Sequence, residues 1–412
     1  MDRADAEERD RADPLAAWVG EFEPTDAAVV YFDGNSLGRL PRRTAARLRE
    51  VTAEWGTSLV RGWGSWIELP GLVGDRLGSA LLGAAPGQVL VCDSTTVNLY
   101  KLAAAALDAQ PARRVIVTDD NNFPTDRYVL EGLARARGLE LRLVDTDPVL
   151  GVQRHHVAAA MSPDVALVTF SHVDYRSGAV ADVRAITDDS HRAGALALWD
   201  LSHAAGAVPA DLDGWAVDLA VGCTYKYLNA GPGAPAWLYV ARALQDRLVP
   251  PIWGWFGQAD QFAMGARYEP APGIRRWLAG TPAVSGLVAV DEGVALLAGA
   301  GMDRVRTKGG ALCAYAEELW RWWLEPLGFG LGSPDVRGSH LALHHREAYR
   351  LSRALIEEAD VIPDFRPPDI VRIGLAPLST RFVDVWDGFD RIRRLAADQA
   401  WNRYDPDPAR VT

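Results

Sequence analysis

The chain has 412 residues, of which 49% are hydrophobic and 24% charged, a balance typical of a folded globular protein rather than a disordered or fibrous one. This length predicts two or three domains, so a single small binding module is not expected. The formal net charge is −11 and no basic stripe offsets it, so nucleic acid is not expected as a partner.

The sequence shows no targeting or membrane-spanning signal. Residues 1–14 carry nine charged side chains instead of the apolar stretch of a secretory signal. The charge-free run of residues 227–241 is only 15 residues long, whereas a bilayer needs roughly 20 apolar residues. Cys92, Cys223 and Cys313 lack the spacing of a zinc site or a disulfide framework. We therefore expect a cytoplasmic protein with no metal and no membrane partner.

The predicted elements follow a charged head, and we expect the ordered part to span about residues 15–400. Between Pro86 and Val240, short apolar runs alternate with longer amphipathic ones, a pattern typical of βα units and a mostly parallel sheet. The predicted strands are residues 89–92, 114–118, 140–144, 165–169, 196–200, 219–222 and 236–239. The predicted helices are residues 96–108, 126–137 and 183–193.

Four small polar residues, Asp93-Ser94-Thr95-Thr96, stand where the first predicted helix begins. Such side chains cap a helix, and the amide groups that remain at its start can hold a phosphate. Plain capping is the commoner explanation for such clusters, so this pattern alone does not identify a site.

The amino-acid composition changes after Val249, where Pro, Gly and Trp become frequent. Residues 250–262 read PPIWGWFGQADQF, which is typical of an ordered loop rather than a helix or strand. Helices over residues 282–300 and 305–323, followed by short strands around residues 339–344 and 370–375, predict a smaller α+β domain at the end of the chain.

Asp200 and Lys226 carry the strongest chemical signal. Asp200 ends one apolar strand and Lys226 lies just beyond the next, so both are expected at the sheet edge where α/β proteins bind ligands. Pyridoxal phosphate needs a lysine amine that bonds to its aldehyde and a carboxylate that keeps its ring nitrogen protonated. Either residue alone is more often structural, but the pair favours pyridoxal 5'-phosphate as the cofactor.

Together, these residues resemble the kynureninase family of pyridoxal-phosphate enzymes, which have the aspartate-aminotransferase fold (fold type I). The resemblance covers nearly the whole chain and implies an α/β domain with a mostly parallel seven-stranded sheet and a smaller α+β C-terminal domain. The domains would be residues 49–275 for the large domain and 276–412 for the small one, with residues 1–48 packing on the small domain. The matching motifs are residues 31–38 (YFDGNSLG), 96–99 (TVNL), 123–126 (FPTD), 199–203 (WDLSH), 225–231 (YKYLNAG), 254–257 (GWFG), 261–264 (QFAM) and 280–282 (GTP).

The resemblance implies a role for each matching site residue. Lys226 would hold the cofactor and move the substrate α-proton, Asp200 would pair with the ring nitrogen, and Tyr225 would contact the phosphate and donate a proton. The other residues expected around the cofactor ring and phosphate are Thr95, Thr96, Phe123, Asp126, Ser171 and His203. In this family the residues at Trp255 and Thr281 reach the phosphate from the other subunit, so a homodimer with shared active sites is expected.

Arg372 interrupts the apolar run of residues 369–375, which otherwise predicts a buried strand. A buried guanidinium requires an anionic partner. The resemblance supplies the substrate α-carboxylate, with Asn35 and Ser36 also expected to bind substrate. A structural salt bridge and a solvent-facing edge position remain the alternatives for Arg372.

The implied reaction is the hydrolytic Cβ–Cγ cleavage of L-kynurenine, or of 3-hydroxykynurenine, to anthranilate or its hydroxylated form and L-alanine. Residues 55–61 lack a histidine that some members carry, and Thr281 is asparagine in some relatives, so the preferred ring substitution stays open. The alternatives are a substituted kynurenine in secondary metabolism, a cysteine desulfurase or aminotransferase of the same fold, and a non-catalytic binding protein. A desulfurase needs a cysteine on a mobile loop, and no cysteine here fits that position.

Overall fold

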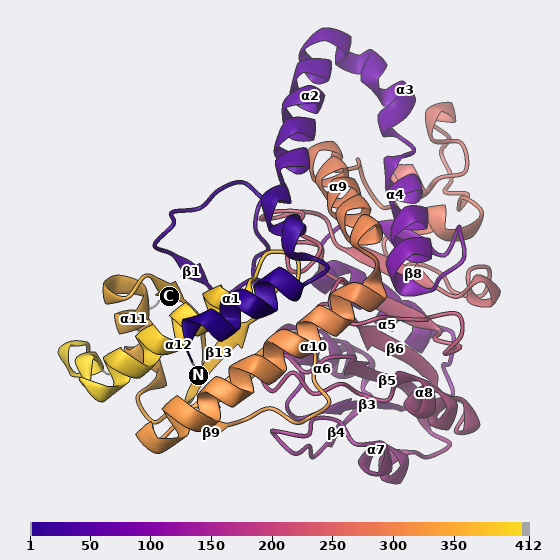
Figure 1. The fold of residues 1–412 in the computed structure, drawn as a ribbon. Coiled ribbons are helices and arrows are strands. Elements are labelled where there is room, and N and C mark those ends of the chain that lie inside the picture. The colour runs from indigo at the N-terminus through magenta and orange to yellow at the C-terminus, as the bar shows by residue number, and fades with distance from the viewer. Residues whose placement is uncertain (1, 406–412) are drawn as a thin grey trace.

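A large seven-stranded sheet forms the centre of the protein, whose residues 2–405 are described in a computed structural model (Figure 1). The strand order is β2-β8-β7-β6-β5-β3-β4, and β8 runs antiparallel to both of its neighbours while the other pairs are parallel. The predicted mostly parallel sheet is therefore confirmed. Its strands are β2 (Val89–Val91), β3 (Val115–Asp119), β4 (Glu140–Val144), β5 (Val165–Ser171), β6 (Leu196–Asp200), β7 (Leu219–Gly222) and β8 (Trp237–Val240).

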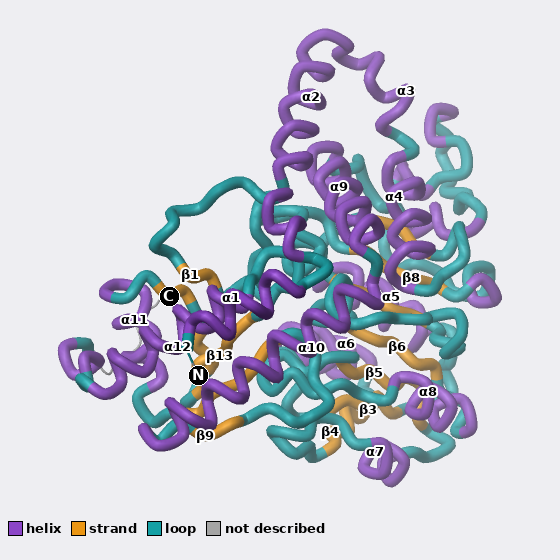
Figure 2. Tube along the Cα trace, in the orientation of Figure 1, coloured by secondary structure: helices purple, strands orange, loops and turns teal. Residues whose placement is uncertain are grey.

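Helices cover both faces of this sheet (Figure 2), which explains why its central strands are mainly apolar and almost wholly buried. Alternate residues of a strand enter different clusters. In β6, Leu198 packs on the face covered by α5 (Thr95–Asp108) and α6 (Pro124–Arg137). Its neighbour Trp199 packs on the opposite face with residues of α8 (Val183–Arg192). The two-residue period of a strand thus builds two apolar layers from one sequence.

A second, antiparallel sheet lies in the C-terminal part, in the order β12-β13-β10-β9. The helices α11 (Ala348–Glu358) and α12 (Phe382–Ala397) pack with it in an apolar cluster separate from the two layers of the large sheet. The N-terminal strand β1 (Val30–Tyr31) pairs in parallel with β11 (Val361–Ile362). The domain limits near residues 48 and 275 stay a prediction. The strands of the second sheet are β9 (Gly330–Leu331), β10 (His340–His344), β12 (Asp364–Arg366) and β13 (Ile370–Gly374).

The charged N-terminal head forms a helix, so the prediction that order begins near residue 15 is wrong. Helix α1 (Arg3–Ala12) packs along α12 although it buries only Ala6. Its charges make the contact, because the Asp10 carboxylate accepts hydrogen bonds from the amide of Phe382 at 2.7 Å and that of Val383 at 3.1 Å, where α12 begins. A carboxylate at a helix N-terminus satisfies amides that the helix cannot. At the other end, residues 406–412 lie outside the described part.

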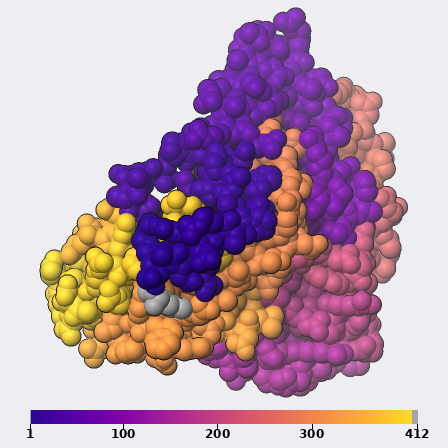
Figure 3. All heavy atoms as spheres, viewed as in Figure 1, coloured from indigo at the N-terminus to yellow at the C-terminus, as the bar shows by residue number. Residues whose placement is uncertain are grey.

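The helices α2 (Arg42–Ser58), α3 (Trp63–Trp66) and α4 (Leu69–Leu77) form an arm that projects from the body (Figure 3). The base of this arm packs on α9 (Val284–Ala300), which precedes α10 (Met302–Leu319). Within residues 2–405, no single helix is both long enough and apolar enough to cross a membrane. Only a bent pair, α9 together with Met302–Leu327, meets the length and composition criteria.

Candidate active site

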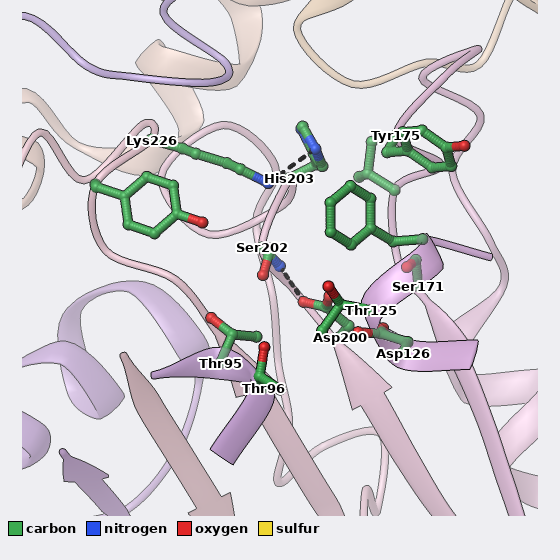
Figure 4. A pocket seen from close by; sticks show the side chains of 13 residues that line it. Thr95, Thr96, Thr125, Asp126, Ser171, Tyr175, Asp200, Ser202, His203 and Lys226 are labelled. Atoms are coloured by element: carbon green, nitrogen blue, oxygen red, sulfur yellow. Dashed lines mark hydrogen bonds between the residues drawn. The ribbon is translucent and has the colours of Figure 1, made fainter. Parts of the chain in front are cut away.

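A cavity lies at the edge of the large sheet where its parallel strands end (Figure 4). Ser171 ends β5, Asp200 ends β6, and Tyr225 and Lys226 follow β7. This is the edge at which doubly wound sheets bind ligands. The cavity brings together nine of the residues expected around the cofactor, which come from five separate segments of the chain. The lining residues are Thr95, Thr96, Phe123, Thr125, Asp126, Ser171, Val173, Tyr175, Asp200, Ser202, His203, Tyr225 and Lys226.

Lys226 is one of only three lysines in the sequence, and it is the one whose amine lines the cavity. The amines of Lys101 and Lys308 are buried in ion pairs, with Asp93 at 2.6 Å and Asp13 at 2.7 Å. The Lys226 Nζ instead lies 2.9 Å from a neutral partner, the His203 Nε2, and 5.8 Å from the centre of the Phe123 ring. The cavity therefore presents a single amine that forms no ion pair with a carboxylate of residues 2–405.

The N-terminal segment holds the lysine loop in place. The Gly38 amide donates a hydrogen bond to the Tyr225 carbonyl oxygen at 2.7 Å. A Cβ atom at Gly38 would lie 2.3 Å from the Lys226 carbonyl oxygen and 2.3 Å from the Asn229 Oδ1. Only glycine allows this approach, which gives a physical reason for the glycine that ends the motif of residues 31–38.

Asp126 and Asp200 form an acid pair on the floor of the cavity. Asp126 lies in the first turn of α6, and burial, followed by the Asp200 charge and a hydrogen bond with Asp200, raises the pKa of Asp126 well above its usual value. The Asp200 Oδ1 accepts a hydrogen bond from the Ser202 amide at 2.6 Å. Asp126 therefore keeps its proton more readily than an ordinary carboxyl group does.

The opposite end of the cavity can bind an anion. The Ser94 hydroxyl caps α5, a helix of 14 residues, and accepts a hydrogen bond from the Val97 amide at 3.4 Å. Just inside the helix, the buried Thr95 Oγ1 has no hydrogen-bond partner among the described residues. An unpartnered hydroxyl beside the positive end of a helix dipole favours a phosphate. Ser171, also expected here, donates instead to the Asn122 side-chain oxygen at 3.1 Å.

His203 and Tyr225 hold defined protonation states. Burial, followed by the charges of Lys226 and Arg372, lowers the pKa of His203 well below its usual value, so the ring is neutral. Its Nδ1 atom is buried and finds no hydrogen-bond partner in the part of the chain that the structure describes. Burial, followed by the effects of Cys223 and Asp200, raises the pKa of Tyr225, so its phenol keeps the proton.

Arg372, Asn35 and Ser36 lie together in a second cluster, beyond the residues that line the cavity. Arg372 is fully buried in β13, and its Nη1 donates to the Tyr175 carbonyl oxygen at 2.5 Å while its Nη2 donates to the Ser36 hydroxyl at 2.8 Å. In its hydrogen-bonding orientation, the Asn35 amide oxygen accepts from the Arg372 Nε at 2.7 Å. The anion beside Arg372 is the Asp364 carboxylate, a residue that the sequence reasoning did not identify.

Trp255 and Thr281 lie on the surface, away from the cavity of their own chain. Trp255 begins a short turn, Trp255–Gly257, and is 45% exposed. Thr281 is exposed beside Asp93. The described lining of the cavity includes neither side chain. Their proposed contribution to a second subunit stays a prediction.

Four lining residues were missed from the sequence, namely Thr125, Val173, Tyr175 and Ser202. Val173 and Tyr175 follow the end of β5, and Ser202 follows the end of β6. The rule that binding residues follow the carboxyl ends of parallel strands could have found these three. Thr125 lies inside the 123–126 motif, but no chemical signal separates it from its neighbours.

The cavity fits pyridoxal phosphate. It offers one un-neutralised amine, an acid pair, an aromatic face at Phe123 and an anion-binding helix start. Two buried atoms without partners, the Thr95 Oγ1 and the His203 Nδ1, require a polar ligand to satisfy them. This set of groups matches the aldehyde, ring nitrogen, ring face and phosphate of the cofactor.

Comparison with known proteins first places the fold. A family model for aminotransferase class V matches residues 78–321, and one for a kynureninase C-terminal domain matches residues 305–392. An apo cysteine desulfurase from Thermococcus onnurineus NA1 superimposes with a TM-score of 0.80 at 17% identity, covering 92% of this chain and 98% of that one. The cystine C-S lyase C-DES gives 0.77 at 19% identity, covering 91% and 98%. The protein therefore has the fold of the class-V aminotransferases, which confirms the predicted fold class.

Sequence relatives then define the family. A kynureninase from Burkholderia pseudomallei (strain K96243) is 43% identical over 411 residues, which cover 97% of this chain and 96% of the relative. A kynureninase from Pseudomonas fluorescens is 43% identical over 404 residues, with 95% of each chain covered. The chain belongs to the kynureninase family, and the resemblance found in its motifs is confirmed.

Proposed function

We propose that this protein is a pyridoxal-phosphate-dependent hydrolase that cleaves the Cβ–Cγ bond of L-kynurenine to give anthranilate and L-alanine in tryptophan catabolism. The observation that carries the proposal is the Lys226 amine, which lies un-neutralised in a cavity that also contains the Asp126–Asp200 pair. Membership of the kynureninase family supplies the substrate class.

When bound, pyridoxal phosphate supplies an electron-accepting ring that stabilises negative charge on substrate carbons near the amine. Lys226 holds the cofactor and moves the α-proton of the substrate. Asp200 keeps the ring nitrogen protonated, and the proton held by Asp126 lies within reach of that carboxylate. Phe123 stacks on the ring face, and Thr95 receives the phosphate at the start of α5, together with Thr96.

Tyr225 is the proton donor for the β-carbon that cleavage leaves behind. Its raised pKa keeps the phenol protonated until a strongly basic carbon forms beside it. Tyr225 directly precedes Lys226 in the sequence, and both side chains line the cavity. Proton removal at one substrate carbon and proton delivery at the next therefore come from neighbouring residues.

Arg372 binds the substrate α-carboxylate, supported by Asn35 and Ser36. Its fully buried guanidinium donates a hydrogen bond to the carbonyl oxygen of Tyr175, which lines the cavity, and a planar fork matches a carboxylate. Asp364 contacts that fork, and the substrate carboxylate would replace this contact.

The protein functions as a cytoplasmic homodimer in this proposal. Large apolar side chains are exposed at the end of α2 and in the following turn, with Trp55 at 65% and Val60 at 77%. The loop that carries Trp255 likewise exposes Phe262 at 65% and Met264 at 73%. Exposed apolar surface of this kind is typical of a protein interface, and Trp255 would reach the partner's cofactor across it.

A cysteine desulfurase activity is opposed by the placement of the cysteines. Cys92, Cys223 and Cys313 are all buried, and none lines the cavity in the described structure. Burial raises the pKa of Cys92 to about 12, which suppresses the thiolate that a nucleophile requires. The desulfurases among the structural neighbours share the fold alone.

Steady-state anthranilate release by the cofactor-loaded protein tests the proposal. We expect cleavage of L-kynurenine, and comparing kcat/KM with that for 3-hydroxy-L-kynurenine decides the preferred ring substitution. Lys226→Ala serves as the inactive control. A normal cofactor spectrum without cleavage of either compound would show that the substrate assignment is wrong, and a substituted kynurenine would be tested next.

A further inference from the structure

His340 is a buried histidine to which the motifs and the roles above assign nothing. It begins β10 with no exposed surface, and within residues 2–405 neither of its ring nitrogens makes a hydrogen bond of normal geometry, although the backbone of Arg176 lies close enough to influence its pKa. An imidazole buried in this way is costly unless a ligand or a water satisfies it. The surroundings of His340 therefore indicate what it binds.

His340 is not among the residues that line the described cavity, but it lies next to His203 and, across the β10–β13 pair, near Arg372. Its ring centre is 5.7 Å from that of His203, whose Nε2 contacts the Lys226 amine. In the β10–β13 register, His340 opposes Gly374 while Ala342 opposes Arg372. Residues at these positions share one face of the sheet, so His340 is a diagonal neighbour of Arg372.

Because Gly178 has no side chain, it leaves space for the His340 ring. A Cβ atom at Gly178 would lie 3.2 Å from the His340 Nε2 and 3.1 Å from its carbonyl oxygen. Gly178 also has a φ of +79°, which disfavours any other residue. The imidazole thus occupies a position that is shaped for it.

Both histidines of this pair are neutral. Burial, followed by the charges of Arg372 and Lys226, lowers the pKa of His340 well below its usual value, and the Arg176 carbonyl only partly opposes this. A neutral imidazole has one N–H donor and one lone pair, so it can hold a water molecule and accept its proton. The His203 Nδ1, also buried and unpartnered, provides a second contact for a bridging water.

We propose that His340 binds and deprotonates the water that attacks the γ-carbonyl carbon of the substrate, with His203 as the second ligand of that water. This role rests on the proposed function. As the water oxygen bonds to the carbonyl carbon, the imidazole lone pair takes a water proton and the C=O electron pair moves to the carbonyl oxygen. The imidazole then returns the proton to that oxygen, so one water adds across the double bond without any oxidant or reductant.

The test separates water addition from the earlier proton removal. Exchange of the α-hydrogen of L-alanine in D₂O requires Lys226 and the bound cofactor but no attacking water. For His340→Gln holoenzyme we expect anthranilate release to fall on the order of 100-fold or more, while alanine exchange and the cofactor spectrum stay within about twofold of wild type. His340→Asn provides a second amide variant. His345→Gln is the matched control, because His345 is also buried but packs between Phe329 and Trp401.

Each outcome decides between the two proposals. An active wild type with equally active His340→Gln and His340→Asn would overturn the inference alone. Equal losses of cleavage and alanine exchange would also overturn it, because they indicate general damage to the site. A wild type that exchanges the alanine hydrogen but releases no anthranilate would overturn the proposed function, and this inference with it.

Discussion

The carboxylate of Asp364 contacts the guanidinium of Arg372 from the directly opposing position on the neighbouring strand. Arg372 is fully buried, and Asp364 has a second cationic partner in Arg366 at 2.8 Å, which is partly exposed. Asp364 can therefore release Arg372 to a substrate carboxylate and remain paired with Arg366. The ion pair keeps the buried guanidinium neutralised while no substrate is bound.

Replacing Arg372 with lysine will raise KM for L-kynurenine by about tenfold or more, because a lysine amine lacks the two-pronged fork that matches a carboxylate. The change in kcat will be smaller, since the fork holds the substrate in the ground state as well as in the transition state. Steady-state kinetics measures both values. Arg366→Lys is the matched control and will keep KM near wild type; an unchanged KM in Arg372→Lys would remove Arg372 from the substrate site.

Borohydride reduction of the holoenzyme will attach the cofactor to Lys226 alone. The amines of Lys101 and Lys308 are buried in ion pairs and cannot compete for the aldehyde. Peptide mass mapping will place one added cofactor on the peptide that contains Lys226, and Lys226→Ala will carry none. Cofactor mass on either of the other two lysines would contradict the site.

Asp200→Asn will bind pyridoxal phosphate but lose activity, on the order of 100-fold or more. An amide cannot hold the ring nitrogen in its protonated, electron-accepting form, whereas the phosphate and aldehyde contacts are unaffected. Absorbance titration will report the retained binding, and anthranilate release will report the lost rate. Activity within tenfold of wild type would assign the ring nitrogen to another group.

Acidification will destabilise the protein in part through His172. Burial, followed by the Arg306 charge, lowers the pKa of His172 to about 4. In the unfolded chain, His172 becomes protonated near pH 6.5, whereas in the native protein it stays neutral until the pH approaches 4. The free energy of unfolding that is present above pH 6.5 is therefore lost as the pH falls toward 4. The loss is roughly 3 kcal/mol at most. Urea unfolding of His172→Phe, compared with wild type across this range, will show a shallower pH dependence; identical slopes would contradict the shift.

Two inactive variants will complement each other if the sites are shared between subunits. Coexpressed Lys226→Ala and Trp255→Ala chains form mixed dimers in which one site has both an intact lysine and an intact tryptophan from the partner. Mixed dimers, purified by two different affinity tags, will therefore regain part of the wild-type activity. No recovery in verified mixed dimers, or a monomer in light scattering, would contradict shared sites.

The large sheet and its ligand edge could be predicted because their signals are local. All of its strands except the edge strand β4 are mainly apolar runs, Asp200 ends β6, and Lys226 lies just beyond β7. The strand order, which the structure shows, makes β6 and β7 neighbours and so brings those two residues to one edge of the sheet.

The remaining features depend on contacts between distant segments. Helix α1 is stabilised by the start of α12, more than 360 residues away, so its charged sequence alone predicted no order. His340 gains its significance from His203 and Gly178, which approach it only in the folded chain. The guanidinium of Arg372 similarly contacts Asp364 only after strands β12 and β13 have paired in their native register.

The pairing of β1 with β11, and the capping of α12 by Asp10, has a consequence for synthesis of the protein on the ribosome. The first thirty residues emerge early, but the strand and helix that they contact emerge only near the end of translation. Residues 31–38 hold the lysine loop through Gly38. They therefore reach their final position only after the C-terminal strand and helix have been synthesised. The large sheet can assemble while the chain is still growing, whereas the lysine loop gains its final support only when the C-terminal helices have been made.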